Sequence, residues 1–157
     1  MGRRAIGMTL AVPLARMSVM SGGDRTGPTR SGVKLTYDDF VLFPDDGKRH
    51  ELIDGEHYVT PSPNVRHQRI SGNLHLLIGT WLEQHARGKV FYAPLDVIFS
   101  NFDVVEPDLL YMSHERVAQN AGRTHVQVVP ELVIEIASHR TRKRDETIKR
   151  HLYGRCG

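Results

Sequence analysis

Hydrophobic and polar residues follow two different periods along this chain. Short apolar runs rich in Leu, Ile, Val and aromatic residues predict β-strands. They lie at His50–Ile53, Glu56–Thr60, Lys89–Ala93, Asp96–Ser100, Val105–Met112 and Val126–Ala137. Helical spacing of apolar residues predicts a long helix over 63–85, with a stripe of Ile70, Leu74, Leu77, Ile78, Trp81 and Leu82, and a final helix over 142–154. This order predicts an α/β or α+β domain whose helices flank one mixed sheet.

Local signals set the expected ends of these elements. Thr36 is expected to cap a short helix through Tyr37, Phe40 and Val41. The pair Asp54-Gly55 between two apolar runs predicts a tight β-hairpin. Ser62 and Pro63 predict the cap and first position of the long helix, and Gly88 predicts its end.

Composition is that of one soluble globular domain, with 157 residues, 39% apolar and 25% charged residues. The single cysteine, Cys156, excludes a disulfide within the chain and favours a reducing, cytoplasmic setting. No apolar run approaches the roughly 20 residues of a membrane-spanning helix. Residues 1–34 show no sustained period and are expected to be a disordered tail or an over-extended start, which leaves 35–157 as the domain.

The net charge of +3 is unevenly distributed. Residues 1–36 and 139–157 each carry +5, whereas residues 37–138 carry −7. A general affinity for nucleic acid therefore does not follow from the basic total. Only a local basic face near the C-terminal end is supported.

Two of the predicted strands carry a carboxylate within a strongly apolar run, Asp108 in Val105–Met112 and Glu135 in Val126–Ala137. A buried carboxylate is costly unless it is paired, protonated or bound to a metal. Oxygen ligands on adjacent strands suit hard cations such as Mg²⁺, but ordinary acids at strand edges are an open alternative. Lys149 borders the apolar face of the last helix; it is either a third member of this group or half of a solvated pair with Asp145.

These residues together resemble a known pattern. Pro107-Asp108, then Glu135 to Ser138, then Lys149 on the following helix is similar to the PD-(D/E)xK nuclease superfamily, and specifically to its Uma-type restriction endonuclease family. Further segments agree in order and spacing over roughly 35–154. They are His50 to Glu56, Pro61 to Pro63, Arg66 to Gln68, Ala93 to Val97, and Asp145 to Tyr153.

The resemblance implies a restriction-endonuclease-like core, a mixed central sheet flanked by helices. It also implies Asp108 and Glu135 as metal ligands and Lys149 as the catalytic lysine. Glu51 corresponds to an additional acid near the metal, and His67 and Asp96 to supporting residues. Members of this family continue after the last helix with further strands, whereas this chain stops at Gly157.

The leading hypothesis is therefore Mg²⁺- or Mn²⁺-dependent hydrolysis of DNA in the cytoplasm. Phosphate contacts are expected from the basic run Arg140, Arg142, Lys143, Arg144 and Arg150. Cleavage at a palindromic site would require a homodimer. Two alternatives stay open: an inactive, truncated nuclease-fold protein that only binds nucleic acid or a protein, and an acidic scaffold without nucleic-acid contact.

Overall fold

The computed structural model describes residues 32–60, 62–138 and 141–157. Most of the predicted tail, and Arg140 of the predicted basic run, lie outside the described residues. The elements are α1 (Tyr37–Phe40), β1 (Arg49–Ile53), β2 (Glu56–Thr60), α2 (Val65–His85), β3 (Gly88–Tyr92), β4 (Val97–Ser100), β5 (Asp103–Val105), β6 (Leu109–Ser113), α3 (His114–Gln119), β7 (Leu132–Ile134), α4 (Arg142–Arg144), the π-helical turn η1 (Asp145–Lys149) and α5 (Arg150–Cys156).

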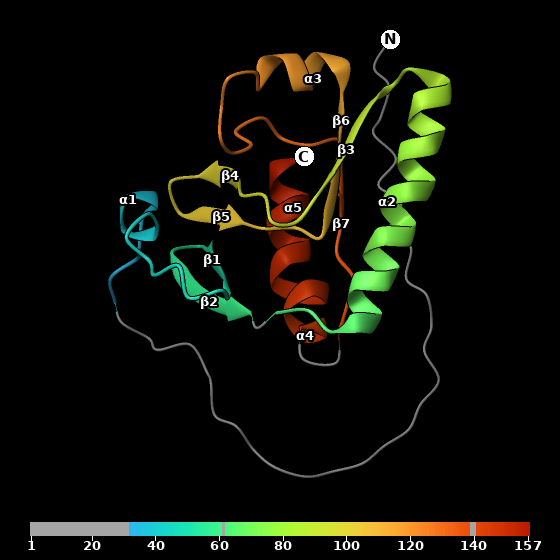
Figure 1. Cartoon of the computed structure of the whole chain (residues 1–157). Helices are drawn as coiled ribbons and strands as arrows, with labels where there is room; N and C mark the ends of the chain where they lie inside the picture. The colour runs from blue at the N-terminus through green and yellow to red at the C-terminus, as the bar shows by residue number, and fades with distance from the viewer. Residues whose placement is uncertain (1–31, 61, 139–140) are drawn as a thin grey trace.

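The strands form two antiparallel sheets, in the orders β2-β1-β5-β4 and β3-β6-β7. Helix α2 packs along β3, and the C-terminal helix formed by α4, η1 and α5 occupies the middle of the molecule (Figure 1). The predicted α+β class is confirmed. The predicted single mixed sheet is instead two antiparallel sheets, and residues 106–108, which include Pro107, connect β5 of one sheet to β6 of the other.

The two predicted acidic strands are shorter than expected. β5 ends at Val105 and β6 begins at Leu109, so that 106–108 connect the sheets. Of the run 126–137, only β7 is a strand, while Val126 makes an isolated parallel bridge to Val97. Asp108 and Glu135 therefore flank strands, one just before β6 and the other just after β7, rather than lying within them.

The hairpin and the first helix are confirmed. Asp54 and Gly55 have φ of 53° and 74°, the left-handed pair that a tight hairpin needs. At α1 the backbone N and Oγ1 of Thr36 both donate to Asp39 Oδ2, at 2.7 and 2.8 Å. These two hydrogen bonds join the N-cap residue to the third residue of the helix, as in a capping box.

The expected cap and stop residues of α2 were wrong, although the helix ends at His85 as expected. Its N-cap is Asn64, whose Oδ1 accepts from His67 N at 2.9 Å, while Ser62 donates to the Gly47 carbonyl instead. The helix ends where Ala86 turns left-handed, with φ of 47°. Gly88 already belongs to β3, where a Cβ would lie 2.2 Å from the Met112 carbonyl oxygen. Close backbone approach, rather than helix termination, requires glycine there.

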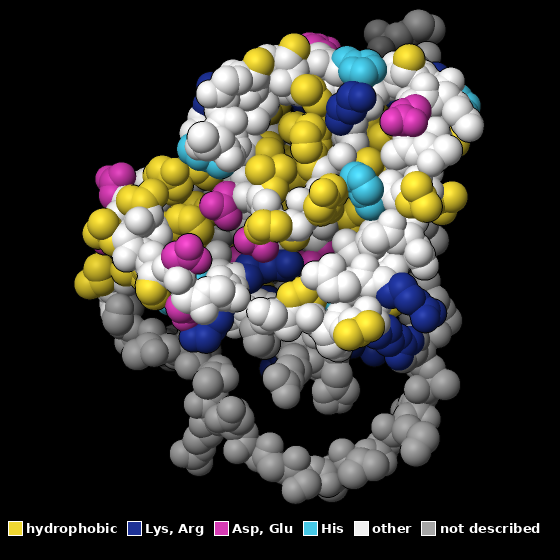
Figure 2. Space-filling model, viewed as in Figure 1, with side chains coloured by type: hydrophobic (Ala, Val, Ile, Leu, Met, Phe, Trp, Pro, Cys, Tyr) yellow, Lys and Arg dark blue, Asp and Glu magenta, His cyan; other side chains and the backbone are white. Residues whose placement is uncertain are grey.

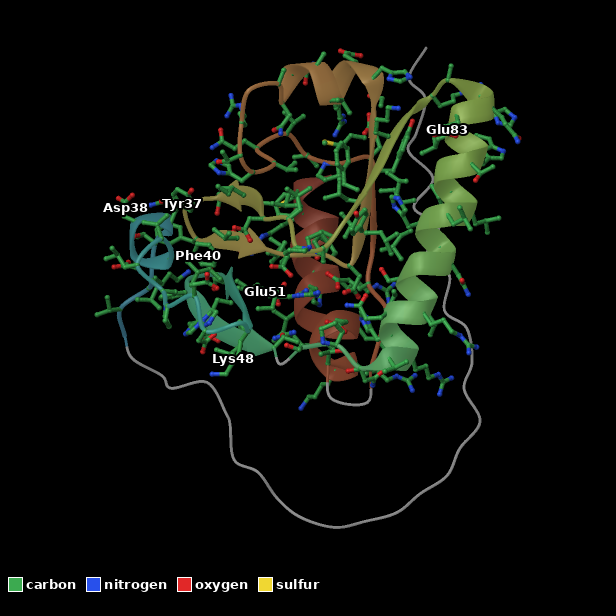
Figure 3. The ribbon with its side chains drawn as sticks, viewed as in Figure 1. Tyr37, Asp38, Phe40, Lys48, Glu51 and Glu83 are labelled. Carbon is green, nitrogen blue, oxygen red and sulfur yellow. The ribbon has the colours of Figure 1, made fainter. Side chains whose placement is uncertain are left out.

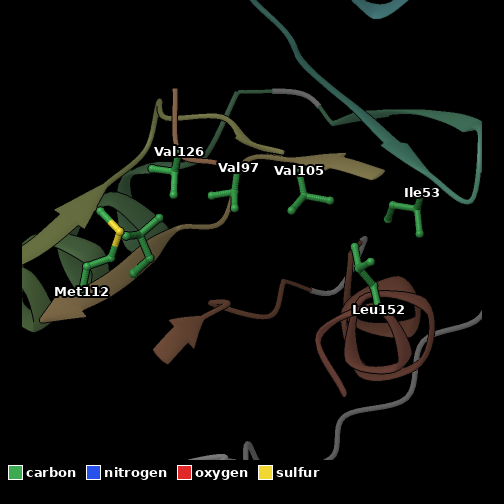
Figure 4. Close-up of a cluster of buried hydrophobic side chains, with 7 residues drawn as sticks. Ile53, Val97, Val105, Met112, Val126 and Leu152 are labelled. Atoms are coloured by element: carbon green, nitrogen blue, oxygen red, sulfur yellow. The ribbon is translucent and has the colours of Figure 1, made fainter. Parts of the chain in front are cut away.

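The core joins both sheets to the C-terminal helix. Ile53, Val105, Met112 and Leu152 are all at most 3% exposed and belong to one cluster (Figure 4). The apolar stripe predicted for α2 is only partly used, because Leu77 is 70% exposed. No described helix is long and apolar enough to cross a membrane.

Candidate active site

Strand pairing brings the two predicted acids together. Leu109 of β6 lies opposite Ile134 of β7, so Asp108 and Glu135 occupy facing positions at the same end of this pair. The backbone N of Ile136 donates to Asp108 Oδ2 at 2.7 Å, which ties the two segments directly. The prediction that the acidic segments are neighbours is confirmed.

Asp108 is only 3% exposed and has three partners. His67 Nε2, from α2, lies 3.1 Å from Oδ2, beside the Ile136 amide. Arg49 Nη1, from β1, donates to Oδ1 at 3.0 Å, and its Nε lies 2.6 Å from Glu106 Oε1. A buried aspartate is thus compensated by one guanidinium and further fixed by a backbone amide.

Lys149 is the most completely buried charge on the C-terminal helix, at 1% exposure. Its Nζ lies 2.6 Å from Glu51 Oε1 and 2.9 Å from Glu135 Oε1. The alternative of a solvated pair with Asp145 was wrong, because Lys149 points inward from the π-helical turn η1. Such turns, rare in helices, are frequent at functional sites.

Burial has the largest effect on the pKa values of Glu135 and Lys149. It raises the pKa of Glu135 from 4.5 to about 7; Lys149 opposes the rise, and Glu51 and Asp108 add to it by repulsion. Burial alone would lower the pKa of Lys149, but Glu135 and Glu51 raise it above its ordinary value. Lys149 therefore stays charged at neutral pH, whereas Glu135 titrates near neutrality.

Glu51 on β1 is completely buried and points into the same region (Figure 3). Its Oε1 accepts from Glu106 N at 3.1 Å and from Lys149. Its Oε2 has no hydrogen bond, and the Arg144 guanidinium lies 3.4 Å away. Glu51 is thus the third carboxylate of the cluster, with one oxygen incompletely satisfied. The family resemblance implied an additional acid at this position.

The predicted basic run divides into two groups. Arg144 turns inward, where its Nη2 donates to Thr60 Oγ1 at 2.5 Å and its guanidinium lies over the Tyr58 ring. Arg142 is 65% exposed and pairs with Glu146. Lys143 and Arg150 are also exposed. Only the outward group is placed to meet an external anion.

Asp96, predicted as a supporting residue, does not contact Asp108. It precedes β4, and burial raises its pKa, with Glu51 adding to the rise and His125 opposing it. It lines a small cavity of about 190 Å³ with Glu106 and Thr124. Its influence on the cluster is therefore electrostatic.

The family model described as "Putative restriction endonuclease", Uma2, matches residues 37–157. The chain belongs to the Uma2 family. No curated protein matches its sequence significantly.

The fold of this Uma2 chain is also that of a solved relative. The crystal structure of "a putative nuclease belonging to DUF820" from Anabaena variabilis ATCC 29413 superposes with a TM-score of 0.61 at 20% identity. The match covers 78% of the Uma2 chain and 67% of the Anabaena chain. At this identity the similarity shows a shared fold.

Two residues of the Uma2 site were missed in the sequence. Arg49 follows a polar, turn-like run in the sequence. However, it lies on the same face of β1 as Glu51 and Ile53, which are both buried, and this alternation could have shown that its side chain points inward. Tyr153, whose OH donates to Glu135 Oε1 at 2.5 Å, was interpreted only as an apolar position. It lies one helical turn after Lys149, on the same face.

The donor set of this Uma2 chain suits a divalent cation. Four carboxylates (Glu51, Glu106, Asp108 and Glu135) meet three permanent cations (Arg49, Arg144 and Lys149). Among the described residues no three His, Cys, Asp or Glu side chains form a ready cage for a metal. Mg²⁺, however, is usually held by one or two carboxylates and several waters. The poorly satisfied Glu51 Oε2 and the mutual repulsion of Glu51, Asp108 and Glu135 fit such a cation.

Proposed function

We propose that this Uma2 chain is a Mg²⁺- or Mn²⁺-dependent endonuclease that hydrolyses phosphodiester bonds of DNA. Its site is of the PD-(D/E)xK type, formed by Asp108, Glu135 and Lys149. The observation that carries the proposal is the burial of Lys149 between Glu51 and Glu135. Lysine is almost never fully buried, and a perturbed, paired lysine among carboxylates is typical of catalytic sites.

Asp108 and Glu135 would hold the cation, with Glu51 in support. Glu135 is favourable for this role because burial and repulsion from Glu51 and Asp108 make its charged form costly without a cation. When bound, the cation supplies Lewis-acid chemistry: it makes water a better nucleophile and neutralises charge on the phosphate. His67 and Ile136 N hold Asp108 Oδ2 and so orient the carboxylate.

Lys149 supplies a fixed positive charge for the reaction. Glu51 and Glu135 hold its Nζ in place and keep it protonated at neutral pH. A preorganised ammonium in a site of low dielectric stabilises the negative charge that develops on the phosphate. Tyr153 positions Glu135 from the same helix.

DNA would be bound by exposed basic residues around this site. Arg142, Lys143 and Arg150 project outward from the C-terminal helix, and Arg66 and Arg69 are exposed on the first turns of α2. Figure 2 shows acidic and basic side chains meeting in the middle of one face, with further basic side chains over the N-terminal end of α2. Such contacts give salt-dependent, mostly sequence-independent binding.

The test is cleavage of supercoiled plasmid in Mg²⁺ by the wild type, Asp108→Ala and Lys149→Ala. Each substitution should lower the rate by at least about 100-fold. Glu83→Gln is the matched control, because it removes a carboxylate at the far end of α2 (Figure 3) and should leave cleavage unchanged. Equal cleavage by all four proteins would reject the assignment, since the activity would then come from a contaminant.

A second candidate is a nuclease-fold protein that only binds nucleic acid or a partner. It is favoured by the ion pairs of Asp108 with Arg49 and of Glu135 with Lys149, because these protein cations already compensate both acids. This candidate predicts no stabilisation by metal. An increase in melting temperature on adding Mn²⁺, lost in Glu135→Ala, would exclude it.

A further inference from the structure

Each of the two principal acids has one oxygen that the protein holds firmly. Asp108 Oδ2 receives the Ile136 amide and His67, and Glu135 Oε1 receives Lys149 and Tyr153. The other oxygens differ. Glu135 Oε2 makes no hydrogen bond or ion pair with a described residue, whereas Asp108 Oδ1 is bound by Arg49 alone.

Arg49 has a second anchor that is independent of Asp108. Its Nε lies 2.6 Å from Glu106 Oε1, and its Nη1 also donates to the Glu106 backbone oxygen at 3.1 Å. The side chain is 15% exposed and lies on β1, two residues before Glu51. It could therefore release Asp108 and stay attached to Glu106.

We propose that Arg49 is a built-in cation that occupies the outward oxygen of Asp108 and is displaced when a divalent cation binds. This inference rests on the proposed function, because it concerns the same site. Asp108 Oδ1 is the oxygen left for a metal once Oδ2 is fixed by the backbone. A guanidinium in hydrogen-bond contact with Oδ1 would lie within a few ångströms of that metal, where like charges repel strongly in a poorly solvated site.

Displacing Arg49 from Asp108 makes metal binding weaker than it would be at the same carboxylates without Arg49. Without a metal, Arg49 neutralises Asp108 and Glu106, and the folded protein needs no ion to tolerate them. With a metal, the contact to Asp108 is lost and only the Glu106 contact remains. The measured affinity is then reduced by the competition, as for any site whose competent state is only partly populated.

The experiment is calorimetric titration of MnCl₂ into the wild type, Arg49→Gln and Arg142→Gln. Arg49→Gln should bind Mn²⁺ about tenfold more tightly, within the usual range of coupling between two sites. Arg142→Gln removes the same charge from an exposed position that pairs only with Glu146, and should change the affinity less than about twofold. Unchanged or weaker binding by Arg49→Gln would overturn the inference, as would equal tightening in both variants, because general electrostatics would then explain it.

A second measurement uses the wild type alone and decides the question even if Arg49→Gln fails to fold. A crystal structure with Mn²⁺ should show Arg49 Nη1 beyond hydrogen-bond distance of Asp108 Oδ1, with Nε still on Glu106. An intact contact between Arg49 and Asp108 beside a bound Mn²⁺ would overturn the inference while leaving the metal site in place. Absence of any Mn²⁺ binding by the wild type would instead reject the metal dependence of the proposed function, and this inference with it.

Discussion

Replacing Lys149 with methionine removes the cation that compensates two buried acids. The side chain is 1% exposed and contacts Glu51, which is 0% exposed, and Glu135. Breaking a buried ion pair by deleting one partner costs about 3–5 kcal/mol, because the remaining charge is left without compensation. For a domain of this size, with a total stability of about 5–15 kcal/mol, Lys149→Met should lower the melting temperature by roughly 10–15 °C at pH 8.

The loss should depend on pH in a defined direction. Without Lys149, the pKa of Glu135 should rise further above 7, and the folded variant can remove the uncompensated charge by protonation. Protonation becomes easier as pH falls toward the ordinary glutamate value of 4.5, where the unfolded chain protonates as well. The difference in stability between wild type and Lys149→Met should therefore shrink as pH falls from 8 to 5.

Thermal denaturation at pH 8 measures the change in melting temperature. Urea denaturation followed by circular dichroism at pH 5 and pH 8 measures how the loss of stability depends on pH. The matched control is Lys149→Met combined with Glu51→Gln and Glu135→Gln, which removes the uncompensated charges and should recover most of the stability lost at pH 8. A loss below about 1 kcal/mol at pH 8, or the same loss at both pH values, would refute the reasoning that Lys149 compensates buried carboxylates.

Three further predictions concern single residues. Burial raises the pKa of Glu135 to about 7, so between pH 4.5 and 7 the folded protein holds a proton that the unfolded chain has lost. As pH rises through that window, the free energy of unfolding of the wild type should fall by up to about 3 kcal/mol relative to Glu135→Gln, measured by urea denaturation. Asn64→Ala should cost about 1 kcal/mol by thermal denaturation through loss of the α2 cap, whereas Ser62→Ala should change stability by less than about 0.5 kcal/mol. Gly88→Ala should cost more than about 2 kcal/mol of stability, because its Cβ would meet the Met112 oxygen. Gly72→Ala, which has open space around it inside α2, should instead stabilise the protein by about 0.5–1 kcal/mol. A mild effect of Gly88→Ala in the same melting assay would contradict the close approach of Gly88 to Met112.

The strand pattern predicted the neighbourhood of Asp108 and Glu135 but not their position relative to the strands. Apolar residues continue past the ends of β5 and β7, where Pro107 is buried and Ile136 is half-buried, so periodicity alone cannot locate Glu106 to Asp108 outside the ladder. At the strand ends, Glu135 is within reach of Lys149, and Asp108 is within reach of Arg49 and His67 from other elements.

Helix α2 illustrates a limit of the hydrophobic period. Its most apolar stripe predicted the buried face, yet Trp81 is 50% exposed and Leu82, beside it, is 5% exposed. Leu74, Ile78 and Leu82 of the stripe are half-buried or buried. Beside them, Gly79 lies against Val90 of β3. Close approach through glycine is a tertiary property that a count of apolar residues does not contain.

Charged contacts between distant segments were the least predictable part of the site. Arg49 reaches Asp108 across 59 positions of sequence, and Arg144 reaches Thr60 across 84. The resemblance to a nuclease family named the acids and the lysine. It carried no information on the arginine that compensates Asp108, because that contact depends on how β1 of one sheet meets the start of β6 in the other.

Plasmid cleavage with and without a divalent cation tests whether Asp108 and Glu135 form a metal-dependent nuclease site. The wild type should convert supercoiled plasmid to nicked and linear DNA when Mg²⁺ or Mn²⁺ is present, and EDTA should stop the reaction. Glu135→Gln, which keeps the size of the side chain but removes its charge, should show no cleavage under the same conditions. Cleavage that persists in EDTA, or equal cleavage by Glu135→Gln, would show that the activity does not come from a metal site at Asp108 and Glu135.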